Sequence, residues 1–221
     1  PPGSGKGVQT DLLTKKFDLQ VINWGESFRE FVQKHAEDKT SPDKKRAERV
    51  RECMLDGSAI LTEDMFYILQ AKITMGLESS TKPIIMDKPG SLPPEAKWLS
   101  EFVTTKQISN CLINLSLSYD KAVLRIASRF YGPSDPKEIP YPSYQAAKAN
   151  CSAGQEPIQR EDDSRIESVK HRYFDLYEAN RQQVLNIYRQ NDFTKILEIN
   201  ADDTVENIHR QILTFLETNF K

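Results

Sequence analysis

The first seven residues have the composition of a phosphate-binding loop. They run Pro1-Pro2-Gly3-Ser4-Gly5-Lys6-Gly7, which is most of the pattern G-x-x-x-x-G-K-[ST]. Glycines let successive backbone N–H groups point at phosphate oxygens, and a following helix adds a favourable dipole. Lys6 would supply a mobile positive charge. The opening glycine of the pattern would precede residue 1, and Gly7 replaces the usual magnesium-binding hydroxyl residue. A simple Gly/Pro turn is the alternative.

A second group of residues combines arginines with carboxylates. Arg125 and Arg129 lie four positions apart, which places them on one face of a predicted helix. Residues 159–163 (QREDD) close a proline-rich stretch, and Arg172 lies on the next predicted helix. Phosphoryl transfer needs such groups, because negative charge must be neutralised while the reacting oxygens are aligned. Arginine suits phosphate because its planar fork bonds bidentately. Alone, each arginine would be expected in a surface salt bridge.

Helices and short apolar strands alternate along the chain, which predicts an α/β fold with parallel strands. Strands are expected at 19–23, 82–87, 111–117 and 195–199. Helices are expected at 7–17, 26–37, 43–56, 61–76, 93–103, 120–130, 164–190 and 204–218, and 131–158 is expected to be loop-rich. Because a phosphate loop normally follows a buried strand, we expect a further strand before residue 1 and hence a five-stranded parallel sheet flanked by helices. Asp87 ends its strand, so it could meet the loop at one site.

Composition narrows the possible classes of protein. The chain has 221 residues and a formal net charge of −2. This near-neutral balance argues against a dedicated nucleic-acid or membrane-surface binder, and no apolar run approaches the roughly 20 residues of a membrane span.

Cys53, Cys111 and Cys151 are too far apart to suggest a disulfide scaffold or a zinc site, so we expect a reducing compartment such as the cytoplasm. A targeting segment before residue 1 stays open. The polar stretch 34–52 is either a solvated helical face or a partner-binding arm.

Together these motifs resemble the adenylate kinase family of nucleoside monophosphate kinases, in the family's order and over nearly the whole chain. The opening PPGSGKGVQ resembles PGSGKGTQ. The stretch 157–177 (PIQREDDSRIESVKHRYFDLY) resembles the long-lid pattern R-x-D-D followed by V-x-x-R. Shorter resemblances are NWGESFRE to T-G-D-x-L-R, IIMDKPGSL to L-D-G-F-P-R-T, LRIASR to R-x-x-x-R, and INADDTVENI to D-G-x-x-x-V.

The resemblance implies a P-loop NTPase-type core with two insertions. The core would comprise 1–23, 58–130 and 164–221, with a nucleoside-monophosphate-binding arm at 24–57 and a lid at 131–163. The lid has the length of the long-lid type, but its single cysteine implies no zinc. The implied reaction converts ATP and a nucleoside monophosphate, with AMP as first candidate, into ADP and a nucleoside diphosphate. Mg²⁺ would accompany ATP. The protein is expected to be a monomer and to act in nucleotide metabolism.

The resemblance also implies roles for individual residues. ATP would be bound by Gly3, Ser4, Gly5, Lys6, Gly7, Val8, Arg125 and Ala201. The catalytic residues would be Lys6, Arg129, Arg160 and Arg172. Asp162 and Asp163 would hold the lid closed, and Asp87 would order Mg²⁺ through water. The acceptor would be bound by Gly25, Arg29, Lys88 and Glu95.

The acceptor half departs from the family pattern. Trp24 replaces a small hydroxyl residue, Lys88 replaces a glycine, and Ser91 replaces the arginine that grips the acceptor phosphate. Glu95 replaces the glutamine that reads adenine. Two hypotheses follow: a working kinase with a rebuilt acceptor pocket, or a degenerate ATP-binding or structural module that contacts a protein partner. The preserved transfer arginines favour the kinase.

Overall fold

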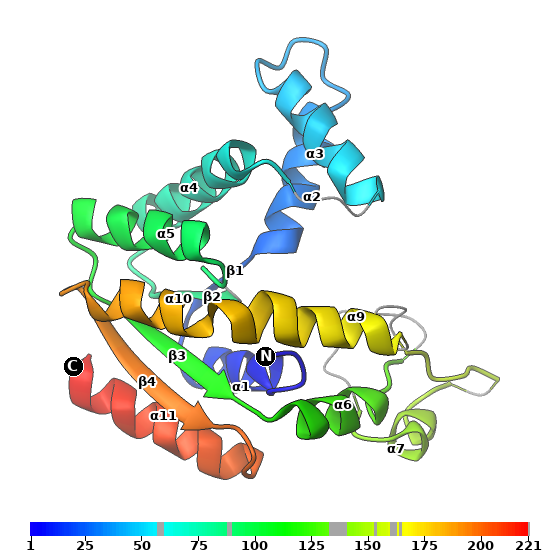
Figure 1. Cartoon of the computed structure of the whole chain (residues 1–221). Coiled ribbons are helices and arrows are strands. Elements are labelled where there is room, and N and C mark those ends of the chain that lie inside the picture. The colour runs from blue at the N-terminus through cyan, green and yellow to red at the C-terminus, as the bar shows by residue number, and fades with distance from the viewer. Residues whose placement is uncertain are drawn as a thin grey trace. The chain divides into compact units, whose positions relative to one another are not determined.

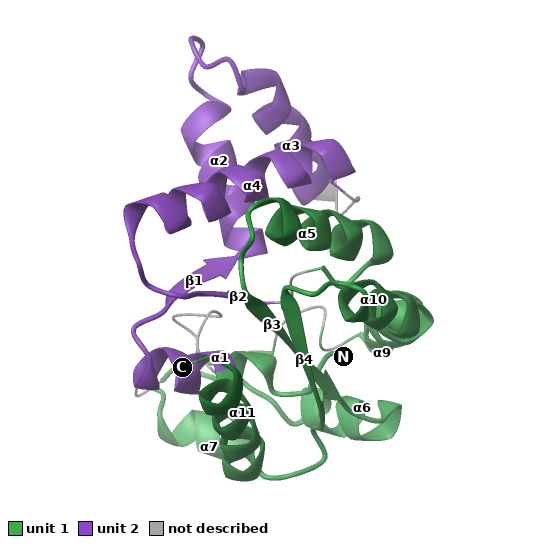
Figure 2. Ribbon diagram, turned by 90° about the vertical axis from the view of Figure 1, so that its left-hand side faces the viewer, with its two compact units in different colours: residues 1–9, 90–221 green, residues 10–89 purple. Residues whose placement is uncertain are grey.

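The computed structural model describes residues 1–56, 60–87, 90–132, 141–152, 154–159, 163 and 165–220 (Figure 1). The chain divides into two compact units (Figure 2). Unit 1 comprises residues 1–9 and 90–221, and unit 2 comprises residues 10–89. Helix α1 (Lys6–Lys16) begins in unit 1 and continues into unit 2. In the described part of the chain, no helix is both long enough and apolar enough to cross a membrane.

The described residues of unit 2 form a short parallel ladder, the larger part of α1 and three further helices. Strands β1 (Gln20–Asn23) and β2 (Ile84–Asp87) pair in parallel over four residues. Helix α2 (Trp24–His35) begins directly after β1, because the Asn23 side chain accepts a hydrogen bond from the Glu26 amide at 3.1 Å. Helix α2 packs against α3 (Lys44–Asp56) and α4 (Thr62–Ser79). The buried apolar side chains of these helices are Phe28, Ala47, Val50, Ile68, Leu69 and Ile73.

Unit 1 is built on a longer parallel ladder. Strands β3 (Asn110–Ser116) and β4 (Thr194–Asn200) pair in register over seven residues. Helices α10 (Ala179–Arg189) and α11 (Val205–Asn219) both pack against β4, and they lie on opposite sides of this ladder (Figure 1). Helix α5 (Pro93–Thr105) packs on α10, and α6 (Tyr119–Ala127) follows β3. Buried aliphatic side chains from these elements include Leu99, Leu115, Leu185, Ile199 and Ile212.

Two stretches differ from the sequence prediction. The long helix expected at 164–190 is a run of three parts: α9 (Ile166–Lys170), a π-helix η1 (His171–Glu178) and α10. Within the described part of the loop-rich stretch lies a short helix, α7 (Tyr144–Ala149). Antiparallel bridges join Phe130 to Tyr141 and Tyr131 to Ile158, so this stretch carries more order than its prolines suggested.

The parallel α/β class is confirmed, and the four predicted strands are observed at nearly the predicted positions. The five-stranded sheet is not observed. An interior strand of such a sheet has hydrogen-bonded neighbours on both sides, whereas each of the four described strands pairs with one neighbour. The described strands therefore form two separate two-stranded ladders, one in each unit.

Candidate functional site

The N-terminal loop has the backbone shape of a phosphate cradle. Gly3 and Gly5 adopt left-handed conformations with φ of +74° and +85°, which side chains other than glycine adopt only with strain. The Ser4 hydroxyl and the Lys6 ammonium both donate to the Pro1 carbonyl, at 2.9 and 2.7 Å. Helix α1 begins at Lys6, so its first amides and its dipole point into the loop. The loop therefore offers backbone donors and one cation to an anionic ligand.

Helix α6 packs against this loop. A Cβ atom built on Gly3 would stand 3.0 Å from the Ala122 carbonyl oxygen and 3.3 Å from Ile126 Cγ1. The loop thus contacts α6 directly, and a side chain at position 3 would crowd the Ala122 carbonyl. Arg125 lies on the same helix, and Arg129 follows its C-terminal end. The structure therefore places the loop and these two arginines on a common support.

A buried carboxylate draws two of the predicted transfer arginines together. Arg129 donates from Nε to Asp163 Oδ2 at 2.7 Å and from Nη2 to Oδ1 at 2.5 Å. Arg172 donates from Nη2 to Asp163 Oδ1 at 3.1 Å. The Asp163 side chain has no exposed surface, whereas the arginine side chains are 20% and 23% exposed. Two guanidinium groups thus converge on one buried carboxylate. Arg160 and Asp162 lie outside the described residues.

The buried side chain of Gln9, which was not among the predicted site residues, ties the loop helix α1 to the first turns of α11. Gln9 donates from Nε2 to the Val205 carbonyl at 3.0 Å, and its Oε1 lies 3.0 Å from His209 Nδ1. Ala201, predicted to contact ATP, is fully buried just before this contact, and its amide bonds the Ser116 carbonyl at 2.7 Å. The available signal was that Gln9 shares a helix face with apolar Leu13, where a polar group needs a partner.

The predicted acceptor residues of unit 2 lie on α2 and at the end of β2. A Cβ atom on Gly25 would stand 3.5 Å from Arg29 Nη1, so these two positions are adjacent, and Arg29 is exposed. Asp87 is the last residue of β2, where it pairs in register with Asn23. Lys88 lies outside the described residues.

Glu95 occupies the start of α5. Its Oε2 accepts hydrogen bonds from the Ser91 amide at 2.9 Å, the Leu92 amide at 3.1 Å and the Ser91 hydroxyl at 3.3 Å. Glu95 is the third residue of α5, after two prolines, the position from which a glutamate reaches back to cap the helix. The carboxylate predicted to read the acceptor base therefore stabilises a helix start in this structure.

The buried hydroxyl of Tyr188 lies close to the turn that leads into α5. A Cβ atom on Gly90, which has a φ of +54°, would stand 2.0 Å from this hydroxyl. Within the described part of the chain the hydroxyl has no hydrogen-bond partner. Burial raises the pKa of Tyr188 well above its usual value, and the charge of Glu95 adds to the effect. The turn into α5 is thus shaped by a glycine that makes room for a tyrosine.

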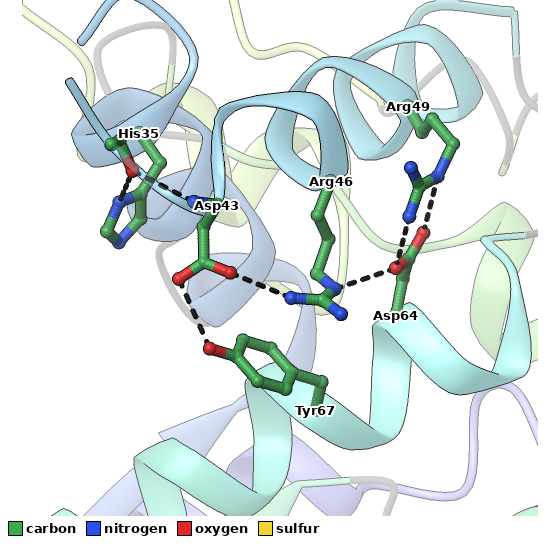
Figure 3. Close-up of polar contacts among 7 residues, drawn as sticks. His35, Asp43, Arg46, Arg49, Asp64 and Tyr67 are labelled. Atoms are coloured by element: carbon green, nitrogen blue, oxygen red, sulfur yellow. Dashed lines mark hydrogen bonds and ion pairs between the residues drawn. The ribbon is translucent and has the colours of Figure 1, made fainter. Parts of the chain in front are cut away.

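Several charged side chains of the 34–52 stretch form ion pairs inside unit 2 (Figure 3). Arg46 and Arg49 both bond the carboxylate of Asp64, a residue that is 1% exposed. Arg46 also bonds Asp43 at 2.7 Å, and its guanidinium lies 3.7 Å from the centre of the Tyr67 ring. Burial lowers the pKa of Arg46, but its contacts with Asp64 and Asp43 outweigh burial and raise it overall. These arginines hold α3 on α4, which the solvated-face interpretation did not anticipate.

Among the described residues no group of three or more His, Cys, Asp or Glu side chains is arranged to hold a metal ion. The three cysteines are unbridged thiols. Burial raises the pKa of the Cys111 thiol to about 11, which makes it a poor ligand at neutral pH.

The chain is similar to adenylate kinases. It is 26% identical to that of Petrotoga mobilis, over 99% of this chain and 95% of the relative. It is 27% identical to that of Chlamydia caviae, over 98% and 94%, and 24% identical to that of Buchnera aphidicola, over 99% and 95%. No family model matches the chain. These similarities are low in identity but extend over nearly the full length of the chain. They support a P-loop kinase fold and a phosphotransferase-like function.

Proposed function

We propose that this chain is a nucleoside monophosphate kinase of the adenylate kinase family, with a divergent acceptor site. It transfers the terminal phosphoryl group of ATP to a nucleoside monophosphate, with AMP as first candidate, and releases ADP and a nucleoside diphosphate. The observation that carries this proposal is the pairing of Arg129 and Arg172 on buried Asp163. A protein that only binds ATP has little need for two converging guanidiniums.

The N-terminal loop forms the half of the site that binds the phosphoryl donor, ATP. The backbone amides of residues 3–7 and the Lys6 ammonium bind the phosphates of ATP, with Val8 in the first turn of α1. Arg125 lies over the base, and Ala201 borders it. Asp87 would help to hold Mg²⁺ through its water shell, and the ion would supply positive charge to the phosphates of ATP. The left-handed glycines and the helix start fit a polyphosphate chain, because both direct N–H groups at one point.

The transfer step needs positioned positive charge rather than a side-chain base, because the acceptor is already a phosphate oxyanion. Arg129, Arg172 and Arg160 neutralise the charge on the migrating group. Asp163 holds two of them together before the substrates arrive, and Asp162 helps to close the lid at 131–163. The arm at 24–57 carries Gly25 and Arg29 to the acceptor. Closure excludes water and so suppresses hydrolysis of ATP.

One observation favours the alternative, a module that binds ATP or has a structural role. The Glu95 carboxylate accepts three hydrogen bonds from Ser91 and Leu92. Together with the serine at position 91, this leaves the acceptor without two of the contacts that the family resemblance implies. In this alternative the 34–52 stretch contacts a protein partner.

The test is a phosphotransfer assay. The protein is mixed with Mg-ATP and separately with AMP, GMP, CMP, UMP and dAMP, and diphosphates are resolved by anion exchange. We expect turnover with one acceptor, and loss of about 10³-fold or more for Arg129→Ala with ATP affinity retained. Arg210→Ala, at an exposed arginine of α11, is the matched control. ATP binding without turnover on any acceptor would refute the kinase and favour the module.

A further inference from the structure

The helix that carries Arg172 contains a widened turn with a definable end. In η1 the backbone bonds span five residues, and its last one runs from the Ala179 amide to the Phe174 carbonyl. From Ala179 the chain returns to α-helical spacing, in which bonds span four residues. At such a change one carbonyl oxygen is skipped by the backbone amides. Because Phe174 O is the last acceptor of the wide part, the skipped oxygen is that of Asp175.

The side chain of Asn180 supplies the missing donor. Its Nδ2 donates to the Asp175 carbonyl at 2.9 Å and to the Leu176 carbonyl at 3.1 Å. A side-chain amide thus stands in for the backbone amide that the change of spacing removes. A carbonyl left without a donor favours return to the ordinary α-helix, so this amide stabilises the wide turn.

The wide turn aligns two buried faces of the same helix. At about 100° per residue, an uninterrupted α-helix would turn the centre of one buried face roughly 90° away from the centre of the other. One extra residue in the wide part absorbs about that rotation. The two buried faces consist of Val169 and Tyr173, and of Val184, Leu185 and Tyr188.

The same alignment places Arg172. Tyr173 is fixed by its hydroxyl, which donates to the Leu117 carbonyl at the end of β3 at 2.8 Å. Arg172, its neighbour, then reaches Asp163. If the helix returned to α spacing while α10 stayed packed, Arg172 would rotate by about 100° away from this carboxylate.

We propose that Asn180 is a positioning residue: by holding the wide turn of η1, it sets Arg172 against Asp163 for phosphoryl transfer. The catalytic part of this statement rests on the proposed function. Asn180 acts through Arg172 and touches no substrate.

The first measurement needs no turnover. The coupling between Arg172 and Asp163 is measured by a double-mutant cycle of Arg172→Ala and Asp163→Ala in urea unfolding, once in the native background and once with Asn180→Leu. Leucine matches asparagine in size but donates no hydrogen bond. We expect a coupling of at least fivefold in the unfolding equilibrium constant, falling below twofold with Asn180→Leu. An unchanged coupling overturns the proposal whatever the activity.

The second measurement is kinetic. Asn180→Leu should lower kcat at least tenfold with the KM for ATP within twofold, and Asn180→Gln, which keeps an NH₂ donor, should restore much of kcat. Asn186→Leu, the same change at an exposed position of α10, is the control and should leave both constants unchanged. An equal loss in Asn186→Leu, or a loss confined to KM, overturns the proposal. Lost coupling in a protein without any turnover would refute the proposed function and still support the placement of Arg172.

Discussion

Replacement of Asp64 by alanine should destabilise unit 2 by about 2–3 kcal/mol. The carboxylate accepts three hydrogen bonds from arginines: from Arg46 Nε at 2.8 Å and from Arg49 Nη2 and Nε at 2.8 and 3.1 Å. Breaking a fully buried ion pair costs about 3–5 kcal/mol. Asp64 is buried, but the arginine side chains are 29% and 44% exposed, so water recovers part of the loss.

The assay can isolate unit 2, because the two tryptophans of the chain lie in different units. Trp24 begins α2 in unit 2, and Trp98 lies on α5 in unit 1. In a Trp98→Phe background, Trp24 fluorescence reports the unfolding of unit 2 alone. Urea is the suitable denaturant, since guanidinium chloride would screen the ion pairs being measured.

Matched variants decide whether burial is the cause. Glu37 pairs with Arg51 at 2.7 Å, but both side chains are exposed, so Glu37→Ala should cost less than about 1 kcal/mol. Arg49→Ala should also cost less than Asp64→Ala, because Arg46 continues to pair the buried carboxylate. If Asp64→Ala and Glu37→Ala differ by less than about 0.5 kcal/mol, the burial argument is wrong.

Three further substitutions test unit 1 and the loop by urea unfolding. Tyr188→Phe should stabilise the protein by about 1 kcal/mol at pH 7, because it removes a buried hydroxyl that has no hydrogen-bond partner among the described residues; a loss of stability would show that the hydroxyl is bonded in solution. Burial raises the pKa of Tyr177 to about 12. The contribution of this pKa difference to the free energy of unfolding is therefore complete below pH 10 and is lost as the pH rises toward 12. Tyr177→Phe should flatten this alkaline slope by at most about 1.4 kcal/mol per pH unit, and an unchanged slope would contradict the assignment. Gly3→Ala should cost about 1–3 kcal/mol because of its φ of +74° and the nearby Ala122 carbonyl, whereas Gly7→Ala, which meets open space, should cost less.

Local features of the donor half were predictable from the sequence. The glycines of the loop were assigned because a tight anion-binding turn demands left-handed backbone, and Gly3 and Gly5 adopt it. The strands and most helices followed from apolar periodicity. The wide turn of η1 did not, because Tyr173, Leu176 and Tyr177 fit α-helical spacing equally well. Its position depends on the core alignment and on the bonds of Asn180, neither of which a periodic pattern contains.

Long-range charge pairing was also beyond the sequence. The charged stretch gave no way to select Asp64 as the partner of Arg46 and Arg49, since the pairing depends on how α3 packs on α4. The role of Glu95 at the start of α5 had an available signal, two prolines followed by glutamate at the third helical position. The family resemblance instead assigned Glu95 to binding of the acceptor base.

The cap at α5 bears on why the acceptor half differs from the family pattern. Two of its three hydrogen bonds start from the backbone amides of Ser91 and Leu92, which any non-proline residue at these positions would supply. Glutamine at position 95 would serve the same cap as glutamate. The arginine and glutamine that the resemblance implies are therefore compatible with this helix start, and the fold does not require their loss. The substitutions thus concern what the segment binds, and Ser91→Arg separates the two hypotheses. In a kinase with a rebuilt pocket, it should weaken turnover of the native acceptor. In a module that has lost its acceptor, it should change neither ATP binding nor the absence of turnover.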